Sequence, residues 1–310
     1  MSEPIYLIKL PHLKVLNANA LSSPLTIGFP AMTAWLGFMH ALERKLNNDY
    51  ELDVQFDALA VISHECNLQT YRGPDDFVNS IIGTGNPLDK DGNRSAFIEE
   101  ARCHLDVSLL IKYEDNEDSP INTAVLNKIH ELIPTMKLAG GDILSVEMPQ
   151  RYILPDGYNN AEKIKLFNSL MPGYALIERR DLMMEAMQEG QDAMDALLDY
   201  VTVNNQCVEI ENSDESKKKP FEWKMQRKTS GWIVPIATGF QGISPLGKAK
   251  NQRDPECSHR FAESMITLGQ FLMVNKAECP DEILWCYAQD FENNLYLCEQ
   301  VQPKHFTSGE

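Results

Sequence analysis

The order of apolar segments in the first 150 residues constrains the fold more than any other feature of the sequence. Residues 5–10 are apolar and alternation continues to Val15, which is typical of a strand. Residues 103–111 alternate strictly, which predicts a strand with one buried side. Further strands are expected at 58–63 and 143–146, and amphipathic helices after Pro30 and after Ser119. This strand, helix, strand, strand, helix, strand order predicts a ferredoxin-like or RRM-like antiparallel sheet within residues 1–150.

The remaining residues, 151–310, predict a second, mixed α/β domain, so the fold class is α+β. We expect a helix that begins at Asp181 and continues to Val201, and a polar, mobile linker at about 208–220. The other expected elements are strands at 174–178 and 232–236, a helix at 261–272, and a hairpin formed by 283–288 and 294–298. A glycine-rich insertion at about 71–96 is too long for a simple turn and is typical of a functional loop.

The charge of the chain argues against non-specific binding to nucleic acid. The 310 residues include 28 Lys and Arg against 45 Asp and Glu, a formal charge of −17, and affinity for phosphate grows with the number of basic contacts. Residues 217–260 are the exception, with ten basic and three acidic side chains. This basic segment is either a solvated loop or a nucleic-acid patch, and charge alone leaves both interpretations open.

Targeting and redox features predict a reduced, cytoplasmic protein. No basic stretch precedes an apolar run at the N-terminus. The 28 uncharged residues between Lys14 and Glu43 contain several Asn, Ser and Pro residues, which argues against a membrane span. The seven cysteines are scattered and none forms a C-x-x-C pair, so neither a disulfide framework nor a zinc knuckle is predicted.

No motif predicts a catalytic, metal or cofactor site. Gly242–Ala249 matches G-x-x-x-x-G-K but has Ala249 where a nucleotide-binding loop needs a hydroxyl. His64-Glu65 lacks the second histidine of a zinc protease, and no G-x-S-x-G elbow surrounds Ser22 or Ser23. A metal-free ribonuclease would need one placed histidine. The candidates are His12, His40, His64 and His104, and spacing favours none of them.

Two polar segments remain as candidate binding sites. Asn17, Asn19, Ser22 and Ser23 follow the first strand, where short polar side chains can bind splayed bases or a ribose. The alternative is a turn closed by Asn and Ser hydrogen bonds. Residues 137–141, which end in Gly140 and Gly141, have the same two interpretations: approach of a phosphate, or a tight turn.

These segments, taken in order, resemble one family. The sequence is similar to the Cas-five-like RAMP subunit of the Csy complex, which caps the five-prime handle of the guide RNA (crRNA) in type I-F CRISPR-Cas systems. The similar segments, which extend over nearly the whole chain, are residues 10–30 (LPHLKVLNANALSSPLTIGFP), 37–42, 86–92, 98–105, 137–144, 172–176, 231–235, 244–246, 260–261 and 284–285.

The resemblance implies an RRM-like RAMP domain whose insertion is a thumb, a second domain, and a non-catalytic role in a surveillance complex. It implies as partners the crRNA handle, the large subunit in a heterodimer, the backbone Csy subunits and the target double-stranded DNA, with no membrane. On this basis we expect Asn17, Asn19, Ser22 and Ser23 to bind the handle and Gly140 and Gly141 to admit phosphate. Arg102, Arg253 and Arg260 are expected to contact the phosphate backbone of the RNA with their positive charges. Arg102 could instead pair with Glu99 or Glu100.

Two other functions compete with handle binding. A RAMP endoribonuclease would cut precursor crRNA, and replacing one histidine with alanine would abolish that activity. A purely structural adaptor would hold the large subunit whether or not RNA is present. The sequence identifies neither the handle bases that are read nor a contact to the protospacer-adjacent motif.

Overall fold

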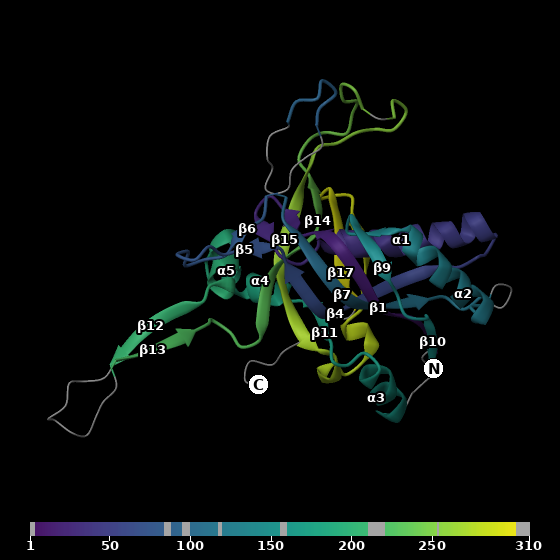
Figure 1. Ribbon diagram of the computed structural model, residues 1–310, viewed down its shortest axis with the longest axis horizontal. Helices are drawn as coiled ribbons and strands as arrows, with labels where there is room; N and C mark the ends of the chain where they lie inside the picture. The colour runs from purple at the N-terminus through teal and green to yellow at the C-terminus, as the bar shows by residue number, and fades with distance from the viewer. Residues whose placement is uncertain are drawn as a thin grey trace.

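The computed structural model describes residues 4–83, 88–94, 100–116, 120–155, 160–209, 221–252 and 254–301, and Figure 1 shows their arrangement. The largest sheet contains β1 (Ile5–Asn19), β4 (Phe56–Leu68), β7 (Arg102–Tyr113), β8 (Lys137–Leu138), β9 (Gly141–Ser145), β10 (Gln150–Leu154), β11 (Tyr174–Glu178), β14 (Trp232–Gly242), β15 (Ala262–Met273), β16 (Trp285–Asp290) and β17 (Leu295–Gln300). The short two-stranded sheets are β2 (Leu21–Ser23) with β3 (Thr26–Ile27), β5 (Thr70–Tyr71) with β6 (Ser80–Ile81), and β12 (Asn204–Glu209) with β13 (Phe221–Gln226).

Helices lie mainly against this sheet. They are α1 (Met32–Tyr50), α2 (Thr123–Leu132), α3 (Asn160–Asn168), α4 (Arg180–Gln188) and α5 (Ala193–Val201), with 3-10 turns η1 (Ile133–Thr135), η2 (Val274–Lys276) and η3 (Pro280–Glu282). Among the residues that the structure describes, no helix is long and apolar enough to cross a membrane.

The six elements expected in the first half are all present, in the expected order. They are β1, α1, β4, β7, α2 and β9, and the neighbours in the sheet are β9, β1, β7 and β4, each pair antiparallel. Helices α1 and α2 cover the same side of these strands, where Trp35, Leu42 and Ile129 join the core formed by Leu105 and Val107. The mixed α/β class with a large antiparallel sheet is therefore confirmed.

Helix α1 forms where the apolar spacing after Pro30 predicts it. Trp35, Phe38, Met39, Leu42 and Leu46 are all buried, because residues spaced by three and four share one side of a helix. The Trp35 indole donates a hydrogen bond to the carbonyl of Pro30 at 3.1 Å. The helix ends at Glu51, whose φ of 54° reverses the chain.

The strands of both halves belong to one sheet, joined at β4. β4 pairs with β7 on one side, and with both β16 and β11 on the other. Because β11, β15, β14, β17 and β16 also pair in that order, these five strands and β4 close into a ring. Trp285 lies inside this junction with no exposed surface, opposite Leu59, and its indole donates to the Leu176 carbonyl at 2.8 Å.

Residues 261–272 form strand β15, so the helix predicted there is wrong. β15 pairs with β11 on one side and with β14 on the other. Central strands are buried on both sides and lose the alternation that marks an exposed strand, so a short apolar run does not distinguish strand from helix. Gly269 lets β15 pack closely against the neighbouring strand β14, because an added Cβ would lie 2.9 Å from the Ile236 side chain.

The single helix predicted from Asp181 to Val201 is also wrong, because the chain forms α4 and α5 instead. Gly190, with a φ of 102°, follows the end of α4. Asp192 then caps α5, since its carboxylate accepts hydrogen bonds from the backbone N–H groups of Met194 and Asp195. Asp181 lies in the first turn of α4 rather than capping it.

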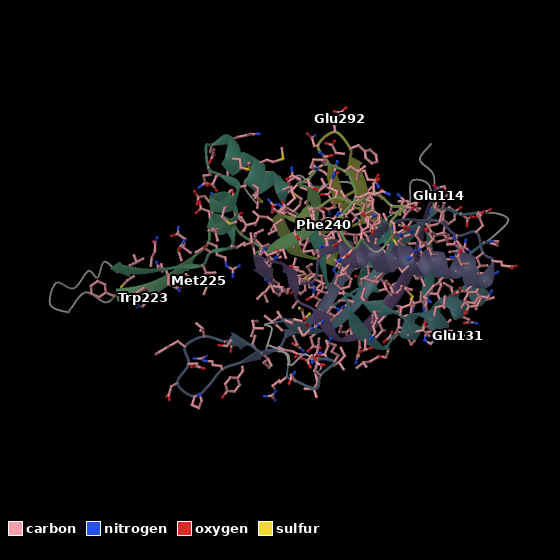
Figure 2. The ribbon with its side chains drawn as sticks, turned by 90° about the horizontal axis from the view of Figure 1, so that it is seen from above. Glu114, Glu131, Trp223, Met225, Phe240 and Glu292 are labelled. Carbon is pink, nitrogen blue, oxygen red and sulfur yellow. The ribbon has the colours of Figure 1, made fainter. Side chains whose placement is uncertain are left out.

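Two hairpins lie where loops were expected. β12 and β13 form a ribbon that projects from the body, with Trp223 and Met225 pointing into solvent (Figure 2). Residues 210–220 of the expected linker lie outside the described residues. Within the insertion at 71–96, β5 pairs with β6 and residues 84–87 and 95–96 are not described. The C-terminal hairpin is confirmed as β16 and β17.

Replacing Trp285 with Ala should strongly destabilise the protein. The change empties a fully buried site and leaves the Leu176 carbonyl without its donor, so we expect a loss of about 3–5 kcal/mol in the free energy of unfolding, measured in urea. Trp223→Ala is the matched control, because Trp223 is 70% exposed and its loss should change stability by less than about 0.5 kcal/mol. Equal effects would show that the junction does not depend on Trp285.

Candidate functional site

A row of polar side chains lies on the side of the sheet opposite α1 and α2. The alternation of β7 places Leu105, Val107 and Leu109 in the core and His104, Asp106 and Ser108 on the other side, as predicted. We call this row the polar face. It consists of two hydrogen-bonded groups, one of Asn17, Gln69 and His104 and the other of His12, His64, Asp106 and Ser108.

At one end of the polar face, Asn17 and Gln69 surround His104. The Asn17 backbone N–H donates to His104 Nδ1 at 3.2 Å, and the Gln69 amide donates to Asn17 Oδ1 at 2.6 Å. The Gln69 amide also lies 3.2 Å from His104 Nε2. Asn17 has a φ of 57° in an irregular part of β1, a conformation that Asn tolerates better than most residues. Asn17 is therefore positioned by the backbone as well as by its partners.

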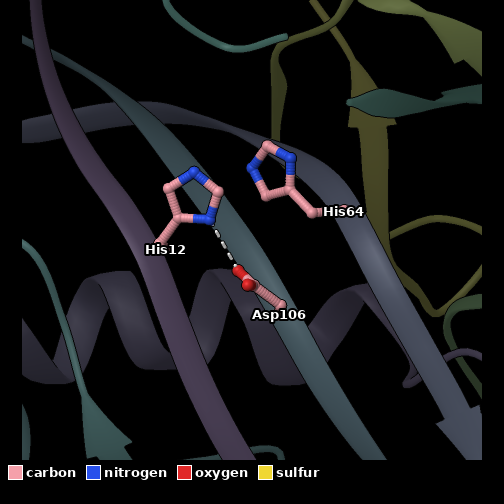
Figure 3. Close-up of side chains that lie close together, drawn as sticks. All are labelled: His12, His64 and Asp106. Carbon is pink, nitrogen blue, oxygen red and sulfur yellow. Dashed lines mark hydrogen bonds and ion pairs between the residues drawn. The ribbon is translucent and has the colours of Figure 1, made fainter. Parts of the chain in front are cut away.

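At the other end, two histidines face one aspartate. His12 Nδ1 lies 2.9 Å from Asp106 Oδ1, and the rings of His12 and His64 stack with centroids 4.3 Å apart (Figure 3). His64 Nδ1 lies 2.6 Å from the carbonyl of Pro172, and His64 Nε2 lies 2.7 Å from Ser108 Oγ. Since a carbonyl only accepts, His64 carries its proton on Nδ1, and the Ser108 hydroxyl donates to Nε2.

The environment of His64 disfavours its charged form. Burial lowers the pKa of His64 below its ordinary value, and the neighbouring His12 adds to this effect. The hydrogen bond to Pro172 and the charge of Asp106 act in the opposite direction, but burial is the largest cause.

Asn19 and Gly140 are brought together at the edge of the sheet. Both line a pocket of about 300 Å³ between the start of α1 and the β8–β9 hairpin, together with Lys137 and Phe38. Ala139 and Gly140 are the two loop residues of that hairpin and both have positive φ, 48° and 75°, which is the geometry of a tight two-residue turn. No atom lies within 4 Å of where a Gly140 Cβ would be, so the surface there is open.

Gly141 supports close packing rather than an open approach to a ligand. A Cβ at this position would lie 2.7 Å from the Leu16 carbonyl oxygen and 2.8 Å from the Ala18 nitrogen. The structure therefore gives Gly141 a packing role, which is neither of the two expected interpretations, phosphate approach or a tight turn.

Ser22 and Ser23 close a small hairpin. Their hydroxyls lie 2.8 and 2.7 Å from Thr26 Oγ1, and Ser23 Oγ accepts from the Leu25 N–H at 3.1 Å. Ser23 is only 4% exposed. Asn19 likewise bonds to its own chain, donating to and accepting from the backbone of Leu21. The turn interpretation therefore accounts for these contacts, while a role in RNA binding stays a prediction.

The three expected arginines are not gathered in one place. Arg102 pairs with Glu100 at 2.5 Å, as the alternative interpretation anticipated, and lies opposite Asn19 across β1 and β7. Arg260 lies at the far end of the sheet, where its guanidinium donates to Asn294 Oδ1. Arg253 lies outside the described residues.

Sequence reasoning considered His12, His64 and His104 but missed the convergence of His12 and His64 with Asp106. The strand alternation showed that His104, Asp106 and Ser108 share one side. The position of the two other histidines depends on irregularities in β1 and β4, which the sequence does not reveal.

Comparison with known proteins identifies a family and a relative. The model of the family described as "CRISPR-associated protein (Cas_Csy2)" matches residues 8–298. The protein "CRISPR-associated protein Csy2" of Pseudomonas aeruginosa (strain UCBPP-PA14) is 32% identical over 315 aligned residues, covering 96% of this chain and 95% of the relative.

Replacing Gly141 with Ala should destabilise the protein by about 1–3 kcal/mol, because the new methyl group collides with the β1 backbone. Gly247→Ala is the control, since no atom lies within 4 Å of the corresponding Cβ, and it should change stability by less than about 0.5 kcal/mol. Chemical denaturation measures both. A tolerated Gly141→Ala would show that β9 can move away from β1.

His64 should titrate below the ordinary histidine value, as measured by NMR of its ring protons. At pH values between the pKa of His64 in the folded protein and its pKa in the unfolded chain, the unfolded chain binds more protons than the folded protein. The contribution of neutral His64 to stability is therefore complete above about pH 6.5 and is lost as the pH falls through the folded pKa. His64→Asn should remove this dependence and exposed His40→Asn should retain it. A His64 pKa at or above the ordinary value would contradict the assignment of burial as the dominant cause.

Proposed function

The chain belongs to the Csy2 family of CRISPR-associated proteins, and from this membership we propose that it is the non-catalytic subunit that binds the five-prime handle of crRNA in a type I-F surveillance complex in the cytoplasm. The observation that carries the proposal is the family match over residues 8–298. The fold and the polar face support the same proposal without relying on the family match.

We further propose that residues 1–150 are a ferredoxin-like RAMP domain. The sheet order β9, β1, β7, β4, with α1 and α2 on one side, supports this assignment. The part of the insertion at 71–96 that the structure describes supports a thumb, because residues 88–94 project beyond the sheet (Figure 1).

The chemistry of the polar face supports specific recognition of RNA. RRM-type sheets bind single-stranded bases on the side opposite their helices, and Asn17, Gln69 and His104 place hydrogen-bonding groups on that side. The pocket with Asn19, Lys137 and Gly140 opens at the edge of the same sheet. A chain with a formal charge of −17 gains little from non-specific phosphate contacts, so specificity for one short RNA end rests on these groups.

The proposed protein partners are the large subunit and the backbone Csy subunits, and the assembled complex binds target double-stranded DNA. The β12–β13 ribbon supports docking of a protein, because Phe221, Trp223 and Met225 alternate along one strand and are 66–70% exposed. The described part of the basic segment, including Lys248 and Lys250, supports a contact with nucleic acid at the β14–β15 end.

A RAMP endoribonuclease is the second candidate, and one observation favours it. Asp106 accepts from His12 Nδ1 and so leaves His12 Nε2 without a proton when the ring is neutral, which is the arrangement of a general base. Incubation with precursor crRNA separates the candidates: fragments that disappear with His12→Ala would establish the nuclease and contradict the non-catalytic proposal.

Handle binding should require Asn17 and Asn19. We expect Asn17→Gly combined with Asn19→Ala to weaken affinity for native-handle crRNA about tenfold, since two hydrogen bonds of about 0.5–1.5 kcal/mol are lost. Glycine retains the positive φ of Asn17. The measurement is titration of labelled crRNA against the chain co-expressed with its large subunit, at physiological salt.

The controls are Asn275→Ala, an exposed asparagine on η2, and crRNA with a scrambled handle. Asn275→Ala should leave affinity unchanged, and the scrambled handle should bind more weakly. Equal binding of both RNAs, unaffected by the double variant, would instead support the purely structural adaptor.

A further inference from the structure

We propose that His12, His64 and Asp106 bind one divalent transition-metal ion of the zinc class, with a fourth position open to solvent. This site is separate from the proposed handle contacts at Asn17 and Asn19 and does not depend on RNA binding. It joins three adjacent strands, β1, β4 and β7, at the centre of the sheet.

The ligand atoms lie close enough together to bind one metal ion after the histidine rings rotate. One ring nitrogen of each histidine and one carboxylate oxygen of Asp106 lie within 4.8 Å of one another. Ligands of tetrahedral zinc lie about 3.3 Å apart, given bonds of about 2.0–2.1 Å, and His12 Nδ1 and Asp106 Oδ1 are already 2.9 Å apart. Figure 3 shows the His12 ring directed at the Asp106 carboxylate, with the His64 ring stacked beside it.

Two irregularities in the sheet create this convergence. Along β1, Leu10 lies opposite Leu109 and Leu13 opposite Val107, so β1 has an extra residue at Pro11–His12. Along β4, Ser63 lies opposite Val107 and Glu65 opposite Asp106, so His64 is itself an extra residue. The two bulges flank the same part of β7. Bulges redirect side chains and are frequent next to functional sites.

The backbone of His12 adds an independent observation. Its φ is 47°, a left-handed conformation that is uncommon for residues other than glycine and that occurs often at functional sites. The Ser108 hydroxyl accepts from the His12 N–H at 3.1 Å and so holds this conformation.

The contacts around His64 are those of a metal-ligating histidine. Its Nδ1–H donates to the Pro172 carbonyl at 2.6 Å, which leaves Nε2 as the nitrogen that faces the cluster. Histidine ligands commonly donate their other ring N–H to a carbonyl or carboxylate, which fixes the tautomer and the ring orientation. Gly173 permits this packing, because an added Cβ would meet the His64 ring at 3.0 Å.

The chemistry of binding is simple. The ion takes the place of the hydrogen between His12 Nδ1 and Asp106 Oδ1, neutral His12 regains a proton on Nε2 so that no net proton is released, and Ser108 rotates its hydroxyl hydrogen away from His64 Nε2. The His12 side chain is 38% exposed and that of Asp106 is 19% exposed, which leaves one side of the cluster open for a water molecule as the fourth ligand.

The test is metal titration of the full chain after removal of metals with a chelator. We expect Zn²⁺ to bind with one-to-one stoichiometry by calorimetry and Co²⁺ to give the visible absorption of a tetrahedral nitrogen and oxygen site. His64→Gln and Asp106→Asn should each weaken binding by at least roughly 100-fold, because loss of even an outer partner costs about 10–100-fold.

Three controls make the result decisive. His40→Gln removes an exposed histidine outside the cluster and should leave affinity unchanged. Circular dichroism establishes that each variant is folded. If His64→Gln does not fold, Asp106→Asn still tests the site, because asparagine keeps the shape of the aspartate side chain. Thiolate ligands would give sulfur-to-cobalt charge-transfer bands. The cobalt spectrum therefore distinguishes binding at any of the seven cysteines from binding at the proposed site. Absence of binding by the folded chain, cobalt spectra dominated by thiolate bands, or equal binding by Asp106→Asn would overturn the proposal.

Discussion

Strand β7 is the element on which the rest of the structure depends. It pairs with β1 on one side and β4 on the other along nearly its whole length. Because its side chains alternate, the same strand supplies core residues beneath α1 and α2 and polar residues to the opposite side. A shift of β7 by one residue would place Asp106 in the core and Leu105 in solvent, so the pairing register and the polar face are fixed together.

The departures from regular pairing are as important as the pairing itself. The extra residues at Pro11–His12 and at His64 direct two histidines toward Asp106, and the positive φ of Asn17 places its amide beside Gln69. In each case a local loss of ladder hydrogen bonds is offset by new contacts to side chains of β7 or its neighbours. Asn17 and His104, two of the groups proposed to bind RNA, thus lie on strands of the sheet rather than on loops, an arrangement that would limit the entropy lost on binding.

Sequence reasoning was most successful where one side of an element is solvated. β1, α1, β7 and α2 have clear periodicity, and their positions were predicted. β15 was misassigned because it pairs on both sides over residues 269–271 and its burial does not alternate along the strand, so its apolar spacing is compatible with a helix. The family resemblance supplied the functional context, whereas the convergence of His12, His64 and Asp106 depends on bulges that only tertiary pairing specifies.

The central claim is that the Asn17, Gln69 and His104 end of the polar face and the adjoining Asn19 pocket hold the crRNA handle. Ultraviolet cross-linking of handle RNA to the assembled complex, with the linked peptides identified by mass spectrometry, tests it most directly. The account predicts cross-links to peptides that contain Asn17, Asn19, Gln69 or His104. Cross-links confined to the β12–β13 ribbon or to the β14–β15 end of the sheet would contradict it.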